Sequence, residues 1–245
     1  MSLCVAGDHS ASDALVAASL SATTRDQPVA GNGRRSARKE KFKSYPIGYF
    51  HIDIAEVRTA EGKLYLFVAI DRTSKFAFVE LHERATTRIA ADFLNALVKA
   101  VPYQIHTVLT DNGLHFTDPA GGALSPAEIK QMMTSQQPFR AHAFELACAR
   151  NDIDHRLTKP KHPWTNGQVE RMNRTIKEAT VKRYHYEDHD QLRRHLADFI
   201  DAYNFGRRLK TLKGLTPYEF VCKCWTSEPQ RFNIDPLQLT PGLNS

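Results

Sequence analysis

One run of eight residues, Lys63–Ile70, constrains the fold most, because apolar side chains fill it almost without a break. A strand of this kind is buried on both faces, so it needs a layer of structure above and below it. Strand-like runs at about 49–57 and 76–81 lie on either side of it, and Asp71–Lys75 has the composition of a turn. The sequence therefore predicts three antiparallel strands at the start of the ordered region, which begins near Tyr45.

The remainder of the chain alternates between helical and strand-like patterns. Ile89, Phe93 and Leu97 recur at helical spacing and predict a helix over Thr86–Ala100. Three antiparallel strands followed by such an alternation indicate an α/β chain (α+β, with a mixed sheet) in which helices flank a central five-stranded sheet. The further elements expected are strands over 105–110 and about 153–158, and helices over about 142–150, 166–184 and 188–205.

Composition divides the chain into segments. Residues 1–33 are rich in small and polar side chains and predict a disordered leader. Residues 34–43 hold six Lys or Arg against one Glu, which fits either a solvated linker or a basic arm on DNA phosphates. The expected organisation is a leader and basic linker over 1–43, a compact core over 44–225, and a tail over 226–245. The core contains an irregular Pro- and Gly-rich insert over 118–141, in which residues 128–133 are a candidate for a short helix.

Several classes of protein are disfavoured by the bulk sequence. No apolar run is long enough to cross a membrane, and the mildly apolar stretch 15–20 lacks the basic leader of a signal peptide. The four cysteines show no zinc-site spacing and are expected to be reduced. We therefore expect a cytoplasmic protein, and the net charge of +6 weakly favours a polyanionic partner.

Two aspartates stand where strands are expected to run or end. Asp53 interrupts the alternating strand 49–55, and a carboxylate in a core-like strand is costly unless it is paired or binds a metal. Asp111 follows the run 105–110 and precedes Asn112-Gly113, a turn signal. Each has an ordinary alternative: a salt bridge at the edge of the sheet for Asp53, and a plain turn for Asp111.

A third acid, Glu170, lies in the first turns of a strongly basic helix. Residues 156–183 contain eight Lys or Arg and two Glu, a balance of +6 that equals the net charge of the whole chain. The ordinary alternative is a surface pair between Glu170 and Arg174, worth a few tenths of a kcal/mol. The concentration of basic residues around one acid favours a metal ligand within a phosphate-binding surface.

Together these segments resemble a known family. The motifs are Ile52-Asp53-Ile54, Leu109-Thr110-Asp111-Asn112-Gly113 and Thr165-Asn166-Gly167-Gln168-Val169-Glu170-Arg171-Met172-Asn173-Arg174. Their ordered set resembles the integrase-core transposases of bacterial insertion sequences, relatives of retroviral integrases with a ribonuclease H-like fold. The run Tyr203–Glu219 also resembles the family's segment after the catalytic core, so the resemblance covers roughly residues 41–225.

The resemblance implies an enzyme that cleaves DNA strands and transfers them to a target. It implies a catalytic and metal-binding triad of Asp53, Asp111 and Glu170 with two Mg²⁺ or Mn²⁺ ions. It also implies double-stranded DNA partners (element ends and target), a homo-oligomer on DNA, and association with the nucleoid. The residues implied to lie near DNA are Lys159, Asn166, Gln168, Arg174 and Lys177.

Two departures from the family pattern leave other functions open. The spacing from Asp111 to Glu170 is 59 residues, longer than the family's commonest form, and the insert over 118–141 accounts for the excess if it loops away. No pair of helices that could recognise element ends precedes Tyr45, and the chain lacks a His/Cys zinc module of the retroviral kind. The alternatives are a nuclease of the same fold that does not join DNA, or a truncated, non-catalytic DNA-binding remnant.

Overall fold

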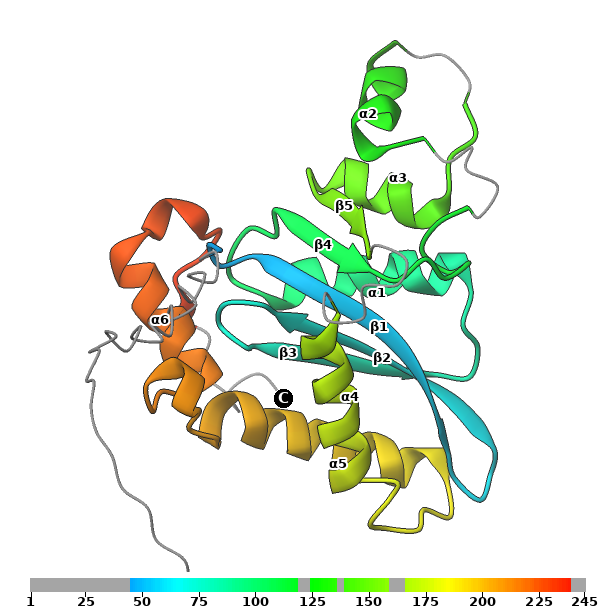
Figure 1. The fold of residues 1–245 in the computed structure, drawn as a ribbon, viewed down its shortest axis with the longest axis vertical. Coiled ribbons are helices and arrows are strands. Elements are labelled where there is room, and N and C mark those ends of the chain that lie inside the picture. Colours follow the sequence, from blue (N-terminus) through cyan, green and yellow to red (C-terminus); the bar gives the residue numbers. More distant parts are fainter. Residues whose placement is uncertain (1–44, 119–123, 136–138, 159–165, 239–245) are drawn as a thin grey trace, which may run out of the picture. The chain divides into compact units, whose positions relative to one another are not determined.

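The computed structural model describes residues 45–118, 124–135, 139–158 and 166–238 (Figure 1). These residues belong to one compact unit. The leader and basic linker expected over 1–43 lie outside the described residues, as do parts of the insert and of the tail. Within the described residues, no helix is both long and apolar enough to cross a membrane.

A mixed five-stranded sheet forms the centre of the fold, as the sequence predicts. Its strand order is β3-β2-β1-β4-β5. The pairs β1–β2 and β2–β3 are antiparallel, whereas β1–β4 and β4–β5 are parallel. The strands are β1 (Tyr49–Arg58), β2 (Lys63–Asp71), β3 (Ala77–His82), β4 (Thr107–Thr110) and β5 (Asp154–Leu157).

Helices cover both faces of this sheet (Figure 1). On one face, Phe50 and Ile52 of β1 pack into a core with Phe93 and Leu97 of α1 and Phe144 of α3. The helices and helical turns are α1 (Thr87–Ala100), α2 (Pro126–Ser135), α3 (Ala143–Arg150), α4 (Gly167–Ala179), α5 (His189–Asp201), η2 (Ala202–Gly206), η3 (Lys210–Leu212), α6 (Pro217–Ser227), η4 (Pro229–Arg231) and η5 (Pro236–Gln238).

The opposite face carries a second core beneath α4 and α5. Leu66, Val68 and Ile70 of β2 pack there with Met172 of α4 and Leu196 of α5. The alternate residues of β2 point into the first core, since successive side chains of a strand face opposite sides of the sheet. The continuous apolar run is therefore a strand buried on both faces, as predicted.

The two helices of the second face end differently from the prediction. The helix expected over 166–184 ends at Ala179, because Thr180 leaves helical geometry (φ −119°, ψ −102°) and its hydroxyl donates back to the Ile176 carbonyl at 2.7 Å. The helix expected over 188–205 is α-helical to Asp201 and then widens into the π-helical turn η2. Asn204 fixes that turn to β3: its side chain accepts from Ala77 N at 2.9 Å and donates to Ala77 O at 2.8 Å.

The fourth strand is shorter than the expected 105–110. Its ladder starts at Thr107 because Gln104 N donates to the Arg231 carbonyl at 2.8 Å and His106 N donates to the Gly48 carbonyl at 3.0 Å. Gly48 has φ +98°, and a Cβ there would lie 2.2 Å from the Gln104 carbonyl oxygen. Only glycine fits this close crossing of two backbones.

Helix α2 of the insert includes residues 128–133, the candidate for a short helix in the otherwise irregular segment. Ser125 and Glu128 bond reciprocally at its start, at 2.7–3.3 Å, in the pattern of a capping box. Ile129 is fully buried, and the helix packs against α3. In Figure 1, α2 lies beyond α3, at the side of the sheet where β5 forms the edge.

Candidate active site

Strand β1 presents Asp53 to the helix α4 side of the sheet. The side chain is half-buried, and its Oδ2 accepts a hydrogen bond from Asn173 Nδ2 of α4 at 2.6 Å. Phe50 and Ile52 lie in the core on the other face, as the alternation along the strand predicts. The amide of Asn173 therefore fixes the direction of the Asp53 carboxylate.

The parallel register of β1 and β4 brings Asp111 level with Asp53. His51 pairs with Leu109, so Asp53 and Asp111 each lie two residues beyond that pair. Neighbouring strands are about 4.8 Å apart, and residues two apart along a strand share a face.

Asp111 itself is exposed, and its Oδ1 accepts a hydrogen bond from Gly113 N at 3.0 Å. A Cβ at Gly113 would lie 2.9 Å from that oxygen, so glycine allows this tight turn.

Helix α4 carries Glu170 in its first turn. Val169, Met172 and Ile176 recur at helical spacing and are buried against the sheet. Glu170 and Arg174 are exposed. The packing of the helix therefore fixes the backbone of Glu170 while its carboxylate stays open to solvent.

The three carboxylates lie close enough to interact. The pKa of Asp53 is raised from 3.8 to about 6, chiefly by burial and also by the negative charges of Asp111 and Glu170. The backbone amide of Ile54 and the side chain of Asn173 act in the opposite direction. Asp53, Asp111 and Glu170 are separated by 58 and 59 positions along the chain. In the fold they share one electrostatic environment.

Ion pairing within the described part of the protein does not explain why these three acids lie here. Among the described residues, none of the three carboxylates forms an ion pair with Lys, Arg or His. The surface pair between Glu170 and Arg174 is therefore absent from this part of the chain.

A cavity of about 360 Å³ opens beside Asp111, between the β1–β2 hairpin and the segment after β4. Its walls include Leu114, which is 63% exposed.

The residues expected near DNA are distributed around α4. Arg174 is exposed and Lys177 half-buried, one and two turns beyond Glu170 on the same flank. Gln168 lies on the other flank, where its Oε1 accepts from Lys75 Nζ at 3.2 Å. Asn166 precedes the helix; it is buried, and its Oδ1 has no hydrogen-bond partner within the described region. Lys159 lies outside the described residues.

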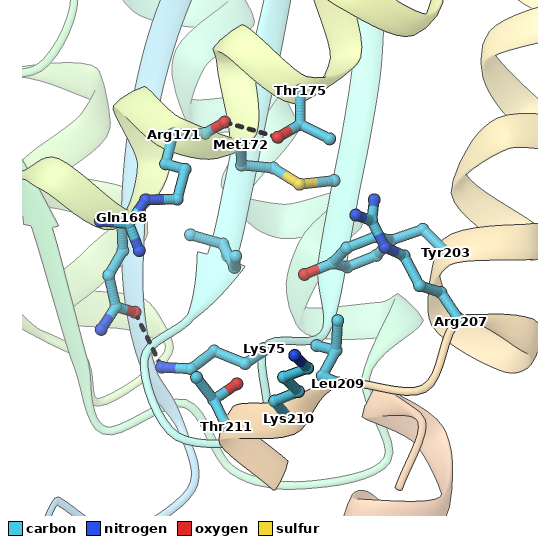
Figure 2. Close-up of a pocket in the computed structure, with 11 residues that line it drawn as sticks. Lys75, Gln168, Arg171, Met172, Thr175, Tyr203, Arg207, Leu209, Lys210 and Thr211 are labelled. Atoms are coloured by element: carbon cyan, nitrogen blue, oxygen red, sulfur yellow. Dashed lines mark hydrogen bonds between the residues drawn. The ribbon is translucent and has the colours of Figure 1, made fainter. Parts of the chain in front are cut away.

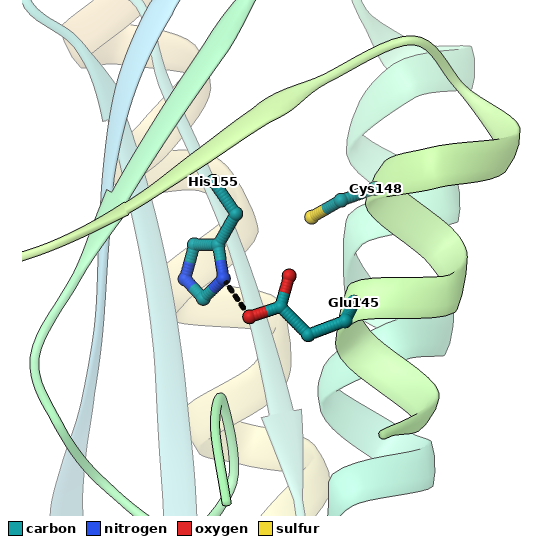
Figure 3. Close-up of side chains that lie close together, drawn as sticks. All are labelled: Glu145, Cys148 and His155. Carbon is teal, nitrogen blue, oxygen red and sulfur yellow. Dashed lines mark hydrogen bonds and ion pairs between the residues drawn. The ribbon is translucent and has the colours of Figure 1, made fainter. Parts of the chain in front are cut away.

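Sequence reasoning missed a buried cluster around His155 (Figure 3). His155 Nδ1 and Glu145 Oε1 are 2.6 Å apart, and His155 Nε2 is 2.8 Å from Thr110 Oγ1. The Thr110 hydroxyl donates to the Asp111 carbonyl at 2.9 Å. The chain Glu145–His155–Thr110 therefore links the interior to the backbone of Asp111. The helical spacing of Glu145 and Cys148 is visible in the sequence, but their meeting with β5 is not.

The same cluster also includes Cys148, and the ligand atoms of Glu145, Cys148 and His155 all lie within 4.8 Å of one another. Both ring nitrogens of His155 already have partners in the protein. Burial, followed by the charge of Glu145, strongly raises the pKa of the Cys148 thiol, which keeps it protonated, whereas metal binding needs the thiolate. The cluster is better explained as a hydrogen-bonded network than as a metal site.

The raised pKa of Asp53 predicts a stabilising substitution. A carboxylate with a higher pKa in the folded state contributes most to stability below about pH 4, and that contribution is lost as the pH rises through about 6. Asp53→Asn should therefore raise the free energy of unfolding of the metal-free protein at pH 7.5. The gain should be at most about 3 kcal/mol, because the pKa of Asp53 is about two units higher in the folded state than in the unfolded state. Urea denaturation at pH 7.5 and pH 4 tests this, since the gain should shrink at pH 4. An equal gain at both values would show that the charge of Asp53 is not its cause.

Comparison with known proteins supports this fold. Two family models, both described as integrase core domain, match residues 43–163 and 151–217. No curated protein sequence matches the chain. The BIV integrase catalytic core is 19% identical with a TM-score of 0.53, and the match covers 75% of this chain and 99% of that one. The HTLV-2 integrase catalytic core in complex with magnesium is 18% identical with a TM-score of 0.52, over 71% and 95% of the two chains.

A chain of the simian T-cell lymphotropic virus intasome is 20% identical with a TM-score of 0.55. The match covers 71% of this chain but only 54% of that one. The mixed sheet, its strand order and these structural matches define a ribonuclease H-like fold of the integrase catalytic-core type. Across residues 43–217, the chain belongs to the integrase core domain family.

Proposed function

We propose that this protein is the catalytic part of a transposase that cleaves DNA strands and joins them to a target in a metal-dependent reaction. The observations that support this proposal are the parallel register of β1 and β4, which sets Asp53 and Asp111 at the same level, and the charges of Asp111 and Glu170, which contribute to the raised pKa of Asp53. Three carboxylates that repel one another, with no cation of the described residues paired to them, form a site suited to divalent metal ions.

The donor atoms fit two Mg²⁺ or Mn²⁺ ions. Carboxylate oxygens are the ligands that Mg²⁺ prefers, and Asn173 Oδ1 beside Asp53 is buried without a hydrogen-bond partner in the described part of the chain. Ions held by Asp53, Asp111 and Glu170 would lower the pKa of a water or DNA 3′-hydroxyl and stabilise charge on the leaving oxygen.

The protein's own residues orient this chemistry. The Asn173 amide directs the Asp53 carboxylate, and the Gly113 backbone N–H directs that of Asp111. Arg174 and Lys177 extend the Glu170 flank of α4 with positive charge, which suits the phosphates that follow a scissile one. Water would act first, to release a 3′ end, and that 3′-hydroxyl would then attack target DNA.

Mg²⁺-dependent joining of labelled DNA ends by the purified chain tests the proposal. Strand-transfer products that require Mg²⁺ or Mn²⁺ and vanish with chelator would support a transposase acting on double-stranded DNA. Cleavage without joining would indicate a nuclease of the same fold, and DNA binding without cleavage a non-catalytic remnant. We also propose a homo-oligomer on DNA, which analytical ultracentrifugation with and without duplex would reveal.

The Glu170 flank of α4 should supply phosphate contacts. The double substitution Arg174→Ala and Lys177→Ala should weaken binding of unrelated duplex sequences alike, and lower the slope of log affinity against log salt by about 1 for each charge removed. Fluorescence anisotropy over a salt series measures both quantities. Because alanine is the best helix former, α4 should stay folded.

A matched control is the double substitution Arg88→Ala and Lys99→Ala, which removes two exposed cations from α1 on the opposite face of the sheet. This control should leave the salt slope unchanged. An unchanged slope in the α4 double variant as well would mean that Arg174 and Lys177 do not contact DNA.

A further inference from the structure

A second group of cations surrounds a cavity on the other flank of α4 (Figure 2). The cavity has a volume of about 360 Å³, within the range of about 300–1,000 Å³ for ligand sites. Lys75, Arg171, Arg207 and Lys210 line it, and its lining includes no Asp or Glu. Ile70, Met172, Tyr203 and Leu209 give it an apolar floor. We call this the cationic pocket.

The cations of the cationic pocket have no ion-pair partner within the described structure. None of the four forms an ion pair there, whereas the neighbouring Arg208 pairs with Glu219 at 3.2 Å. Burial lowers the pKa of Lys75, as do the charges of Arg72 and Arg171, while the negative charge of Asp71 acts in the opposite direction. Like charges held together around a partly buried cavity are costly, and an anionic ligand would relieve that cost.

The fold holds the walls of this pocket firmly. Lys75 Nζ bonds the Gln168 side chain and the Arg72 carbonyl. The π-helical turn η2, tied to β3 through Asn204, carries Tyr203 and leads into Arg207. The Arg207 guanidinium lies 5.9 Å from the centre of the Tyr203 ring. A π-helical turn of this kind occurs frequently at functional sites.

The pocket and the candidate active site share helix α4. At about 100° per residue, Gln168, Arg171 and Thr175 lie about 100–160° around the helix from Glu170. The width of a helix with its side chains is about 10–12 Å, which corresponds to about three or four nucleotides at about 3.4 Å each. A DNA strand engaged at Glu170 can therefore reach the cationic pocket by crossing the helix.

We propose that the cationic pocket binds one unpaired nucleotide of a DNA strand that crosses α4 from the active site. The cations receive its phosphates, and the base lies on the apolar floor against Tyr203 and Met172. The base must be unpaired because only a nucleotide outside the stack presents its face to such a floor. This inference rests on the proposed function, since it requires a chain that engages DNA at Glu170.

The test compares two DNA probes: a blunt duplex, and the same duplex with a four-nucleotide single-stranded extension at one end. The wild-type chain should bind the extended duplex more tightly. The double substitution Arg207→Ala and Lys210→Ala should weaken that binding on the order of tenfold or more, leaving the affinity for the blunt duplex unchanged. Its salt slope on the extended duplex should fall by about 0.7 per charge removed. Arg88→Ala with Lys99→Ala is the matched control and should behave like the wild type.

Each result distinguishes the pocket from the proposed function. If the wild type cleaves DNA but binds both probes equally, the pocket inference fails alone. If it prefers the extended duplex through Arg207 and Lys210 but never cleaves, the pocket stands and the catalytic proposal fails. If the double variant binds both DNA probes normally but loses binding to a labelled oligoglutamate peptide, the pocket accepts an acidic protein segment and the nucleotide proposal is overturned.

Discussion

Asp53→Asn, Asp111→Asn and Glu170→Gln should each reduce Mg²⁺-dependent strand cleavage on the order of a thousandfold or more, because metal ligands act as a unit and each loss approaches loss of the whole site. Every substitution removes one ligand charge and almost no volume. The Asn173 bond to residue 53 and the Gly113 bond to residue 111 can both be kept, since the new amides also offer an acceptor oxygen. The measurement is cleavage of a labelled duplex under single-turnover conditions.

A suitable control for these variants is Glu178→Gln, which changes an exposed acid two turns further along α4. It should cleave DNA at the wild-type rate. Thermal melts should show that all the variants remain folded. Substantial cleavage by any one of the three variants would remove that residue from the mechanism.

His155→Ala should cost about 3–5 kcal/mol in the free energy of unfolding. The imidazole side chain is 1% exposed and links Glu145 to Thr110. Its loss would leave the 7% exposed Glu145 carboxylate without its partner and open a cavity beside the Phe144 ring, whose centre lies 5.0 Å from that of His155. Urea denaturation followed by circular dichroism gives the value directly.

Two further substitutions show whether the network itself is responsible. His185→Ala removes an exposed histidine and should change stability by less than about 0.5 kcal/mol. Glu145→Gln keeps a side-chain oxygen that can accept from His155, so it should cost less than His155→Ala. If His155→Ala were as stable as the wild type, the network would contribute nothing to the fold.

The sheet was predictable because its strands carry local patterns. The run Lys63–Ile70 has the composition of a strand buried on both faces, and Phe50 and Ile52 alternate with polar neighbours in β1. The limits of the elements were less predictable where distant contacts decide them. Strand β4 begins later than expected because the residues before it form backbone hydrogen bonds with Gly48 and Arg231. The π-helical turn η2 depends on the contact between Asn204 and Ala77, which lies 127 residues away.

The functional regions also divide into residues that the local sequence predicts and residues that only the fold brings together. Asp53, Asp111 and Glu170 each stand in a recognisable local setting, so they could be proposed from the sequence. The cationic pocket could not, because Lys75, Arg171 and Arg207 come from three separate segments and meet only through the packing of α4 and η2 on the sheet. The flank to which Gln168 turns also depends on Lys75, which lies 93 residues earlier in the chain.

The central position of β1 has a consequence for the newly made chain. β1 is the first of the five strands to leave the ribosome, and β2 follows it almost at once. The strand that covers its other edge arrives much later, since Tyr49 pairs with Thr107, 58 residues further on. At about 5–20 residues per second, this interval lasts about 3–12 seconds. For that time in every round of translation, the edge of β1 at Tyr49–His51 is open to pairing with another nascent chain, unless a chaperone shields it.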